Sequence, residues 1–279
     1  MKKKFIAIIA VVIIVASLTA CFVGCGATNL KGLDIDLAKA VAAELGLEVK
    51  FQKISWDTKE VELNAGNIDM IWNGLTISDD RKVSMAISEP YLKNNQVCVI
   101  NRKNKDVLTT KESLVGKKFS AEKASAGVAA INKNFPGVKL VETEDQMSNF
   151  IELISGTSDV AVIDSTMANY YCNDANSDYG KNCMVIPNIV LSSEEYGIAL
   201  RKNDLGTLDK LNVALASMYA SGKTKLIADK YQLGSEVVAV EYTSKYDRLT
   251  SLEKEGWESI LKKGKFTIGY TVYAPIAFK

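Results

Sequence analysis

The chain has 279 residues, 47% of them hydrophobic, and a formal net charge of +1. This length provides ample material for a core and allows one large domain or two of medium size. The near-neutral charge argues against a nucleic-acid-binding protein, and the absence of histidine excludes Ser-His and Cys-His catalysis and the commonest metal ligand.

Residues 1–25 have the pattern of an export signal. Three lysines at positions 2–4 precede an apolar run at 5–16, and small residues then precede Cys21. This order is typical of a secretory signal peptide. A membrane anchor is the alternative, because the apolar run is only modestly shorter than the ~20 residues of a transmembrane helix. Under either interpretation, we expect the remaining chain to lie outside the cytoplasm.

The residues around Cys21 also indicate lipidation. Leu18-Thr19-Ala20-Cys21 resembles a bacterial lipobox, and Gly24-Cys25-Gly26 is a second candidate, in which Phe22 stands where an aliphatic residue is preferred. The resemblance implies that Cys21, or alternatively Cys25, is acylated, for example with palmitate. The protein would then be anchored to the outer face of the cell membrane, with a periplasmic location as the alternative.

Three further cysteines follow the leader. Export permits a disulfide, and Cys172 and Cys183 flank a polar, turn-rich insert at 173–182. They could therefore form a disulfide or remain free thiols. Cys98 lies in an apolar run and has the features of a buried strand residue.

Strands and helices alternate twice along the chain, which favours an α/β fold of two lobes with a mainly parallel sheet in each. We expect hinge strands near 96–100 and 196–201. The expected helices cover 33–45, 55–66, 121–130, 146–153, 205–220, 224–231 and 248–263, and the other expected strands cover 47–51, 68–72, 138–141, 159–164 and 264–278.

The stretch at 72–81 carries the strongest candidate site residues. Gly74 lets the backbone turn sharply, and the hydroxyl of Thr76 can donate and accept hydrogen bonds. Ser78 is a candidate N-cap, and the helical turn that follows would hold Arg81, whose guanidinium suits a carboxylate. A plain junction with a solvated arginine is the alternative.

The second half of the chain repeats this pattern. Each half has a helix end, a glycine and then an aspartate that opens a buried strand. The strands lead to Asn73, Gly74 and Thr76 in one half and to Asp164 in the other. Since ligands of open α/β sheets bind at the carboxyl ends of strands, Arg81 and Asp164 would offer opposite charges across a cleft, as a zwitterion requires.

From residue 32 to residue 233 the chain resembles the extracytoplasmic solute-binding proteins of ABC importers for polar amino acids, which have the bilobed type II periplasmic-binding fold. Each matching motif is weak alone, but their order and spacing are specific. The motifs are Asp34-Ile35-Asp36-Leu37, Gly66-Asn67-Ile68-Asp69, Gly74-Leu75-Thr76-Ile77-Ser78, Arg81, Ser88-Glu89-Pro90-Tyr91, Gly116-Lys117-Lys118 and Tyr196-Gly197-Ile198-Ala199-Leu200-Arg201.

The resemblance implies a role in ligand binding for four residues. Arg81 would bind the α-carboxylate of an amino acid. Thr76 and the carbonyl of Gly74 would hold the carboxylate and the α-ammonium. Asp164 of the second lobe would pair with the α-ammonium.

The resemblance also implies a closing loop and a side-chain pocket. The backbone N–H groups of Ser125 and Ala126 would close on the carboxylate at a helix N-terminus. That loop usually opens with glycine, whereas this chain has Ala124. Trp56 and Asn73 fall near the pocket for the ligand side chain. Trp72 does as well, although packing between sheet and helix is the alternative for both tryptophans.

One departure concerns the order of segments. The family begins with a strand of the form Gly-x-x-x-Tyr-Ala-Pro, which this chain carries at its far end, within 264–278. The order therefore predicts a circular permutation in which Tyr273 covers the ligand. Three explanations remain open: the strand completes its own lobe, it completes a neighbour's lobe in a strand-swapped dimer, or it is the remnant of a truncated tandem protein.

The expected organisation is a first lobe of residues 30–97, 199–235 and 264–279, and a second lobe of residues 98–198. A linker and charged helix occupy 236–263. The resemblance implies binding of a polar amino acid, closure of the lobes and delivery to an ABC permease, with no catalysis, cofactor, metal or nucleic acid. A lyase or dehydratase of small carboxylates is the alternative, with Glu122 as the candidate acid or base, although a surface carboxylate is the simpler interpretation of Glu122. A non-functional remnant is the third alternative.

Overall fold

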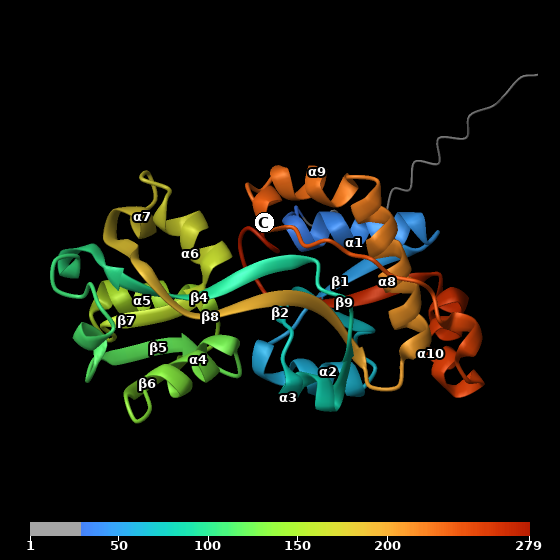
Figure 1. The fold of residues 1–279 in the computed structure, drawn as a ribbon, viewed down its shortest axis with the longest axis horizontal. Coiled ribbons are helices and arrows are strands. Elements are labelled where there is room, and N and C mark those ends of the chain that lie inside the picture. The colour runs from blue at the N-terminus through green and yellow to red at the C-terminus, as the bar shows by residue number, and fades with distance from the viewer. Residues whose placement is uncertain (1–28) are drawn as a thin grey trace, which may run out of the picture.

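Two long strands run through both halves of the molecule in the computed structural model, which describes residues 29–279. They are β4 (Leu92–Asn101) and β8 (Cys183–Arg201), and they pair antiparallel from Leu92 opposite Tyr196 to Asn101 opposite Cys183. Figure 1 shows one α/β lobe at each end of this pair. The two-lobed α/β prediction is confirmed. The signal peptide and the candidate lipidation sites Cys21 and Cys25 lie outside the described residues.

The strands form one continuous hydrogen-bonded path in the order β1-β9-β2-β8-β4-β7-β5-β6, and β3 also pairs with β8. Pairs within a lobe that exclude β4 and β8 are parallel, and pairs with β4 or β8 are antiparallel, so the sheet is mixed. The other strands are β1 (Glu48–Lys53), β2 (Met70–Thr76), β3 (Met85–Ile87), β5 (Lys118–Glu122), β6 (Lys139–Thr143), β7 (Val160–Asp164) and β9 (Lys265–Tyr270).

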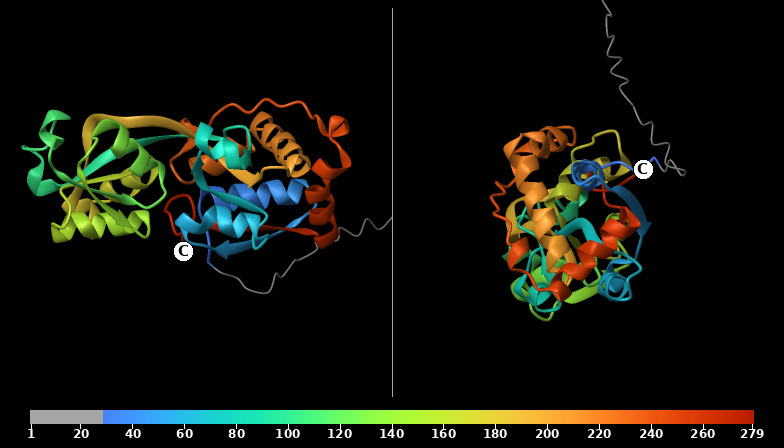
Figure 2. Two further views of the ribbon diagram at one scale, coloured as in Figure 1. Left: turned by 90° about the horizontal axis from the view of Figure 1, so that it is seen from below. Right: turned by 90° about the vertical axis from the view of Figure 1, so that its right-hand side faces the viewer.

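Helices cover both lobes, as Figures 1 and 2 show. The first lobe carries α1 (Leu33–Glu44), α2 (Lys59–Asn64), α3 (Asp79–Ser84), α8 (Leu205–Ala220), α9 (Lys223–Asp229) and α10 (Ser251–Lys263). The second lobe carries α4 (Ala126–Asn134), α5 (Gln146–Ser155), α6 (Ser165–Cys172) and α7 (Asp178–Asn182). Short 3₁₀ turns lie at Trp56–Thr58, Arg102–Asn104, Glu112–Leu114, Gly234–Glu236 and Tyr246–Arg248.

The late strand β9 completes the sheet of the first lobe. It lies between β1 and β2 and is parallel to both, with Ile268 opposite Phe51 on one side and Met70 on the other. Asp69 fixes its start, because the Thr267 amide donates to the Asp69 carboxylate at 2.8 Å and the Asp69 amide donates to the Thr267 carbonyl at 2.7 Å. In this structure the strand docks beside β1 and β2, in the lobe that carries Arg81.

The three cysteines of the described region are buried free thiols. The alternative of a disulfide between Cys172 and Cys183 is therefore wrong in this structure. Both side chains lie in the largest hydrophobic cluster, where a thiol packs as a small apolar group. Burial raises the pKa of Cys172 to about 12 and that of Cys183 to about 11. Cys98 is buried on β4, as its apolar context predicted.

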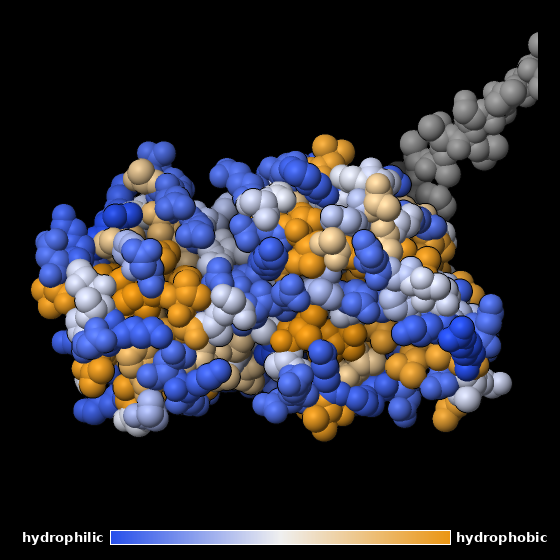
Figure 3. All heavy atoms as spheres, viewed as in Figure 1, coloured by the Kyte–Doolittle hydropathy of each residue, from blue (hydrophilic) through white to orange (hydrophobic). Residues whose placement is uncertain are grey.

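The outer surface is mixed in polarity. On the face drawn in Figure 3, hydrophilic and hydrophobic residues are interspersed over both lobes. None of the helices within residues 29–279 combines the length and apolar character needed to cross a membrane.

Candidate functional site

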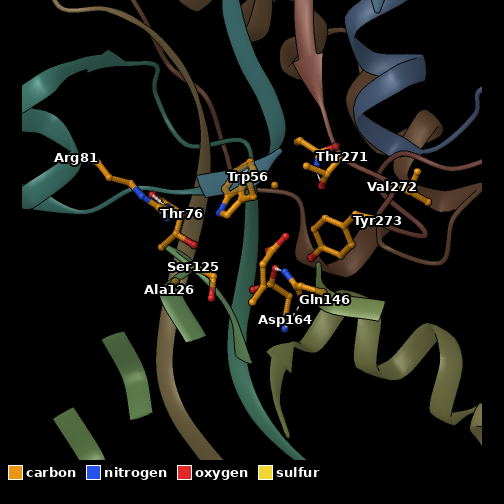
Figure 4. Close-up of a pocket in the computed structure, with 13 residues that line it drawn as sticks. Trp56, Thr76, Arg81, Ser125, Ala126, Gln146, Asp164, Thr271, Val272 and Tyr273 are labelled. Carbon is orange, nitrogen blue, oxygen red and sulfur yellow. Dashed lines mark hydrogen bonds between the residues drawn. The ribbon is translucent and has the colours of Figure 1, made fainter. Parts of the chain in front are cut away.

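A small cavity lies where the two lobes face each other. All nine residues predicted to contact a ligand line it, and four others join them. The lining residues are Trp56, Asn73, Gly74, Thr76, Arg81, Glu122, Ser125, Ala126, Gln146, Asp164, Thr271, Val272 and Tyr273. In Figure 4, Arg81 and Thr76 lie at one end of the group and Tyr273 lies toward the other.

Arg81 of α3 is held in place by residues that directly precede this helix. The Ser78 hydroxyl accepts a hydrogen bond from the Arg81 amide at 3.3 Å, so the predicted N-cap of α3 is confirmed. The Nη1 of Arg81 donates to the Thr76 carbonyl at 2.7 Å. Among residues 29–279, no carboxylate lies within 4.0 Å of its guanidinium. An arginine fixed in direction without a counter-ion is suited to bind a carboxylate from outside.

Asp164 ends β7 on the opposite lobe and is only 5% exposed. Its carboxylate accepts hydrogen bonds from Asn94 Nδ2 at 2.8 Å and from the side-chain amides of Gln96 and Gln146. Neutral amides stabilise the charge without cancelling it. Within the described chain, no cation lies within 4.0 Å of this carboxylate.

The loop before α4 aims a helix N-terminus at the cavity. Ser125 caps this helix, since its hydroxyl accepts from the Val128 amide at 3.4 Å. Ala124 has a φ of +55°, the left-handed conformation that favours glycine. The loop therefore adopts at Ala124 a backbone conformation natural for the glycine usual in the family. Lys59 Nζ of the first lobe donates to the Ala124 carbonyl at 3.2 Å.

Gly74 forms a tight backbone contact on the first lobe. Its φ is +62°, and a Cβ at this position would lie 2.7 Å from the Tyr273 ring. Its amide donates to Oδ2 of Asp34 at 2.8 Å, and the Tyr91 hydroxyl donates to both oxygens of that carboxylate. Burial raises the pKa of Asp34 to about 7, although the Tyr91 and Gly74 hydrogen bonds oppose this shift. No sequence motif had indicated this support from α1.

Tyr273 connects the segment after β9 with the second lobe. Its hydroxyl forms hydrogen bonds with the Tyr196 hydroxyl at 2.6 Å and with the Thr166 hydroxyl on α6. Asn73 donates to the Thr271 hydroxyl at 2.8 Å, while its own side-chain oxygen is buried without a partner in the described region. Asn73 therefore keeps an unused acceptor beside the cavity.

The two tryptophans differ. Trp56 lines the cavity and lies close to two cations, with Lys59 Nζ 4.8 Å and Arg81 Cζ 5.9 Å from its ring centroid. Trp72 is fully buried, packs edge-on against Tyr91 at 6.2 Å and does not line the cavity. For Trp72 the packing interpretation is therefore correct.

Glu122 is not the surface carboxylate of the simpler interpretation. It ends β5, lines the cavity and is only 4% exposed. Burial raises its pKa to about 8, and the nearby charges of Asp164 and Asp145 raise it further. The error arose because β5 ends in polar residues, and only the packing of the other lobe over this strand end removes them from water.

Glu194 is a site neighbour that the sequence did not indicate. It lies opposite Asn94 in the β4–β8 ladder, and its Oε1 accepts from Thr76 Oγ1 at 2.9 Å, from Asn94 at 2.6 Å and from Gln96 at 2.8 Å. Burial and the charge of Asp164 raise its pKa to about 7. Nothing in the local sequence marks Glu194, because its position depends on the register of two distant strands.

Comparisons with known proteins agree on one family. The bacterial extracellular solute-binding proteins, family 3, match residues 19–234, and β9 lies outside this match. A probable histidine-binding protein of Neisseria gonorrhoeae is 33% identical over 206 residues, which cover 73% of this chain and 75% of that protein.

Two solved structures extend the comparison. An ABC uptake transporter substrate-binding protein from Streptococcus pneumoniae with bound histidine is 32% identical, with a TM-score of 0.67 over 75% of this chain and 85% of that chain. An ancestral amino-acid-binding protein, described as a precursor of cyclohexadienyl dehydratase, is 31% identical, with a TM-score of 0.65 over 71% of this chain and 84% of that chain.

Proposed function

Because the chain belongs to the bacterial extracellular solute-binding proteins, family 3, we propose that it binds a polar amino acid between its lobes and delivers it to an ABC permease. The observation that carries this proposal is the pair of Arg81 and Asp164. They line one cavity from opposite lobes, and neither has a counter-ion within the described region. An amino-acid zwitterion would supply a carboxylate to Arg81 and an ammonium to Asp164.

Several contacts between the lobes support a mechanism of closure. Lys123 of the second lobe forms a salt bridge with Asp57 of the first at 3.0 Å, and Tyr273 reaches Thr166. A ligand that binds to both lobes adds to these contacts only when the lobes are closed. Moving the equilibrium from 1:99 to 99:1 needs about 5.5 kcal/mol in favour of the closed state. The closed, loaded form would be the one that the permease recognises.

Isothermal calorimetry against the standard amino acids tests this function. We expect Arg81→Ala and Asp164→Ala to lose measurable binding of the amino acid that wild type binds, with the fold retained by circular dichroism. Arg81→Lys should also bind poorly, because an ammonium cannot reproduce the planar guanidinium. The matched controls are Lys82→Ala and Asp106→Ala, both on exposed side chains. Wild-type affinity in either cavity variant would contradict the proposal.

We also propose that the protein is anchored by a lipid on Cys21 after cleavage behind Ala20. The support is the lipobox-like sequence and a family that acts outside the cytoplasm. Mass spectrometry of the mature N-terminus should find an acylated Cys21, and Cys21→Ser should release the protein or leave it unprocessed. A lipid on Cys25 would assign the site to that residue, and a mature protein without a lipid would contradict the anchor.

We propose further that the chain does not catalyse a reaction. The relatives above are named as binding proteins, although one is a precursor of a dehydratase. The bound amino acid should be recovered unchanged after prolonged incubation, as measured by mass spectrometry. Conversion of the ligand, lost in Glu122→Gln, would favour the lyase alternative.

The lobe boundaries and oligomeric state complete the proposal. We propose a monomer in which residues 30–97, 199–235 and 264–279 form the first lobe and 98–198 the second, with 236–263 as linker and helix. In this arrangement β9 takes the place of the first strand of the family. Light scattering should give the mass of one chain, and a dimer would favour the swapped alternative.

A further inference from the structure

Glu122 is a buried acid without a partner. Its side chain makes no hydrogen bond, and no cation lies within 4.0 Å of its carboxyl group, among residues 29–279. It lies at the carboxyl end of β5, next to the parallel strand β7 that ends in Asp164. A carboxyl group that is buried against a cavity and left unpaired is costly unless the cavity supplies its partner.

The nearest cations are already engaged. Lys59 Nζ donates to the carbonyls of Trp56 at 3.0 Å and Ala124 at 3.2 Å. Arg81 donates to the Thr76 carbonyl and would hold the carboxylate of the ligand. Neither therefore pairs directly with Glu122.

The charges around the cavity are also unbalanced. Among the described residues that line the cavity, Arg81 is the one cation, and Glu122 and Asp164 are the two carboxylates. When all three are ionised, they sum to a net charge of −1. A zwitterion adds no net charge, so it leaves this excess in place.

We propose that the ligand is an amino acid with a cationic side chain and that Glu122 binds that side-chain cation. This inference rests on the proposed function, since it takes Arg81 and Asp164 as the partners of the α-carboxylate and α-ammonium. Trp56 and Tyr273 line the same cavity, and aromatic rings attract guanidinium, ammonium and imidazolium groups. Glu122 would then be the residue that distinguishes a cationic from a neutral side chain.

The raised pKa of Glu122 is consistent with this role. Without ligand, Asp164 on β7 and Asp145 before α5 add to the effect of burial, and Lys59 on α2 and Arg81 on α3 oppose it. Near pH 7 a group with a pKa of about 8 is mostly protonated. A bound cation would favour the ionised form, so binding would release a proton and the affinity would rise with pH up to about 8.

The test compares ligands that differ in charge but little in shape. Wild-type protein is titrated by calorimetry with arginine and lysine, and with citrulline and glutamine, where citrulline is the neutral counterpart of arginine. We expect one of the two cationic amino acids to bind at least about tenfold more tightly than either neutral one, as a charge-assisted hydrogen bond to a buried acid requires.

The variant Glu122→Gln keeps the shape of the side chain and removes its charge. It should lose at least about tenfold in affinity for the cationic ligand and retain its affinity for the neutral ones. It should also release no proton on binding, which is measured by repeating the calorimetry in buffers of different ionisation enthalpy. Without ligand it should melt at or above the temperature of wild type, which shows that it folds. Glu142→Gln, on an exposed side chain of the same lobe, is the matched control.

The outcomes separate the two proposals. Tight binding of a neutral amino acid, or equal loss of all ligands in Glu122→Gln, would overturn the cationic inference and leave the proposed function intact. If wild type bound none of the standard amino acids, the proposed function itself would be overturned.

Discussion

The amide nitrogen of Gly74 lies 2.8 Å from Oδ2 of Asp34, although the two residues are 40 positions apart. Asp34 is in the first turn of α1, and Gly74 is in β2, the strand that leads to Arg81 of α3. The buried carboxylate therefore fixes the backbone turn beneath the cavity. Asp34 is not among the residues that line the cavity, but it holds the amide of Gly74, which is one of them.

The first prediction concerns the pH dependence that Asp34 gives to stability. Its pKa is 3.8 in an unfolded chain and about 7 in the fold. Between these values the unfolded state loses the proton while the folded state keeps it, so this group lowers the free energy of unfolding as pH rises from about 4 to 7. In Asp34→Asn this dependence should vanish. The difference between the two proteins should change by roughly 4 kcal/mol across that window.

Urea unfolding at about pH 3.5 and about pH 8, on either side of this window, measures the difference. Asp36→Asn, two residues along the same helix and partly exposed, is the control. If the free energy of unfolding changed with pH in the same way in wild type and Asp34→Asn, the prediction of a raised pKa for Asp34 would be wrong.

The second prediction concerns the contact between Gly74 and Tyr273. A methyl group at Gly74 would lie 2.7 Å from the Tyr273 ring and 3.1 Å from the Tyr196 ring. Gly74→Ala should therefore weaken amino-acid binding by at least about tenfold and destabilise the protein by more than the ~1–2 kcal/mol of a left-handed alanine. Gly46→Ala separates the two effects, because Gly46 has a φ of +70° and no atom near an added Cβ. If Gly74→Ala and Gly46→Ala lost equal stability and equal affinity, the clash with the Tyr273 ring would not be the cause.

The third prediction concerns the strain at Ala124. Ala124→Gly should stabilise the protein by about 0.5–1 kcal/mol, since glycine adopts a φ of +55° without a Cβ penalty but loses more freedom on folding. Asn188→Gly is the matched comparison, because Asn188 also has a positive φ, of 64°, and asparagine tolerates this conformation. Chemical unfolding of both variants gives the answer. Destabilisation by Ala124→Gly would mean that the alanine methyl group makes a stabilising contact.

The fourth prediction concerns β9. Deletion of residues 264–279 should abolish both a cooperative melting transition and amino-acid binding, because β1 and β2 would lose their shared neighbour. Phe266→Ala, on a fully buried side chain of β9, should destabilise by about 3–5 kcal/mol. Leu261→Ala on the exposed face of α10 is the control. A truncated protein that melts and binds as before would make the segment dispensable.

The sequence predicted the parts of the fold that depend on local signals. Periodicity and capping placed α8 at the observed residues and identified Ser78 as the N-cap of α3. The site residues were predictable for a similar reason. Family motifs mark strand ends, and strand ends of both lobes meet at the cavity, so Arg81, Asp164 and their predicted partners all line it.

The remaining features depend on long-range register. The sequence indicated a strand only from Tyr196, whereas β8 begins at Cys183, because its first part alternates irregularly between buried and exposed residues as it crosses between lobes. Glu194 enters the site through its pairing with Asn94, and Glu122 is buried only where the two lobes meet. A local sequence pattern cannot predict the pairing of distant strands or burial between the two lobes.

The position of β9 between β1 and β2 has a consequence for the order in which the molecule takes shape during synthesis. The elements from β5 to α7 form a continuous stretch of sequence, so most of the second lobe can fold before the last residues of the chain arrive. In the first lobe, β1 and β2 lack their shared neighbour until residues 265–270 have been made and exported. Its hydrophobic surfaces therefore stay exposed for longest, and a chaperone or export factor that holds the nascent chain would have most to protect there.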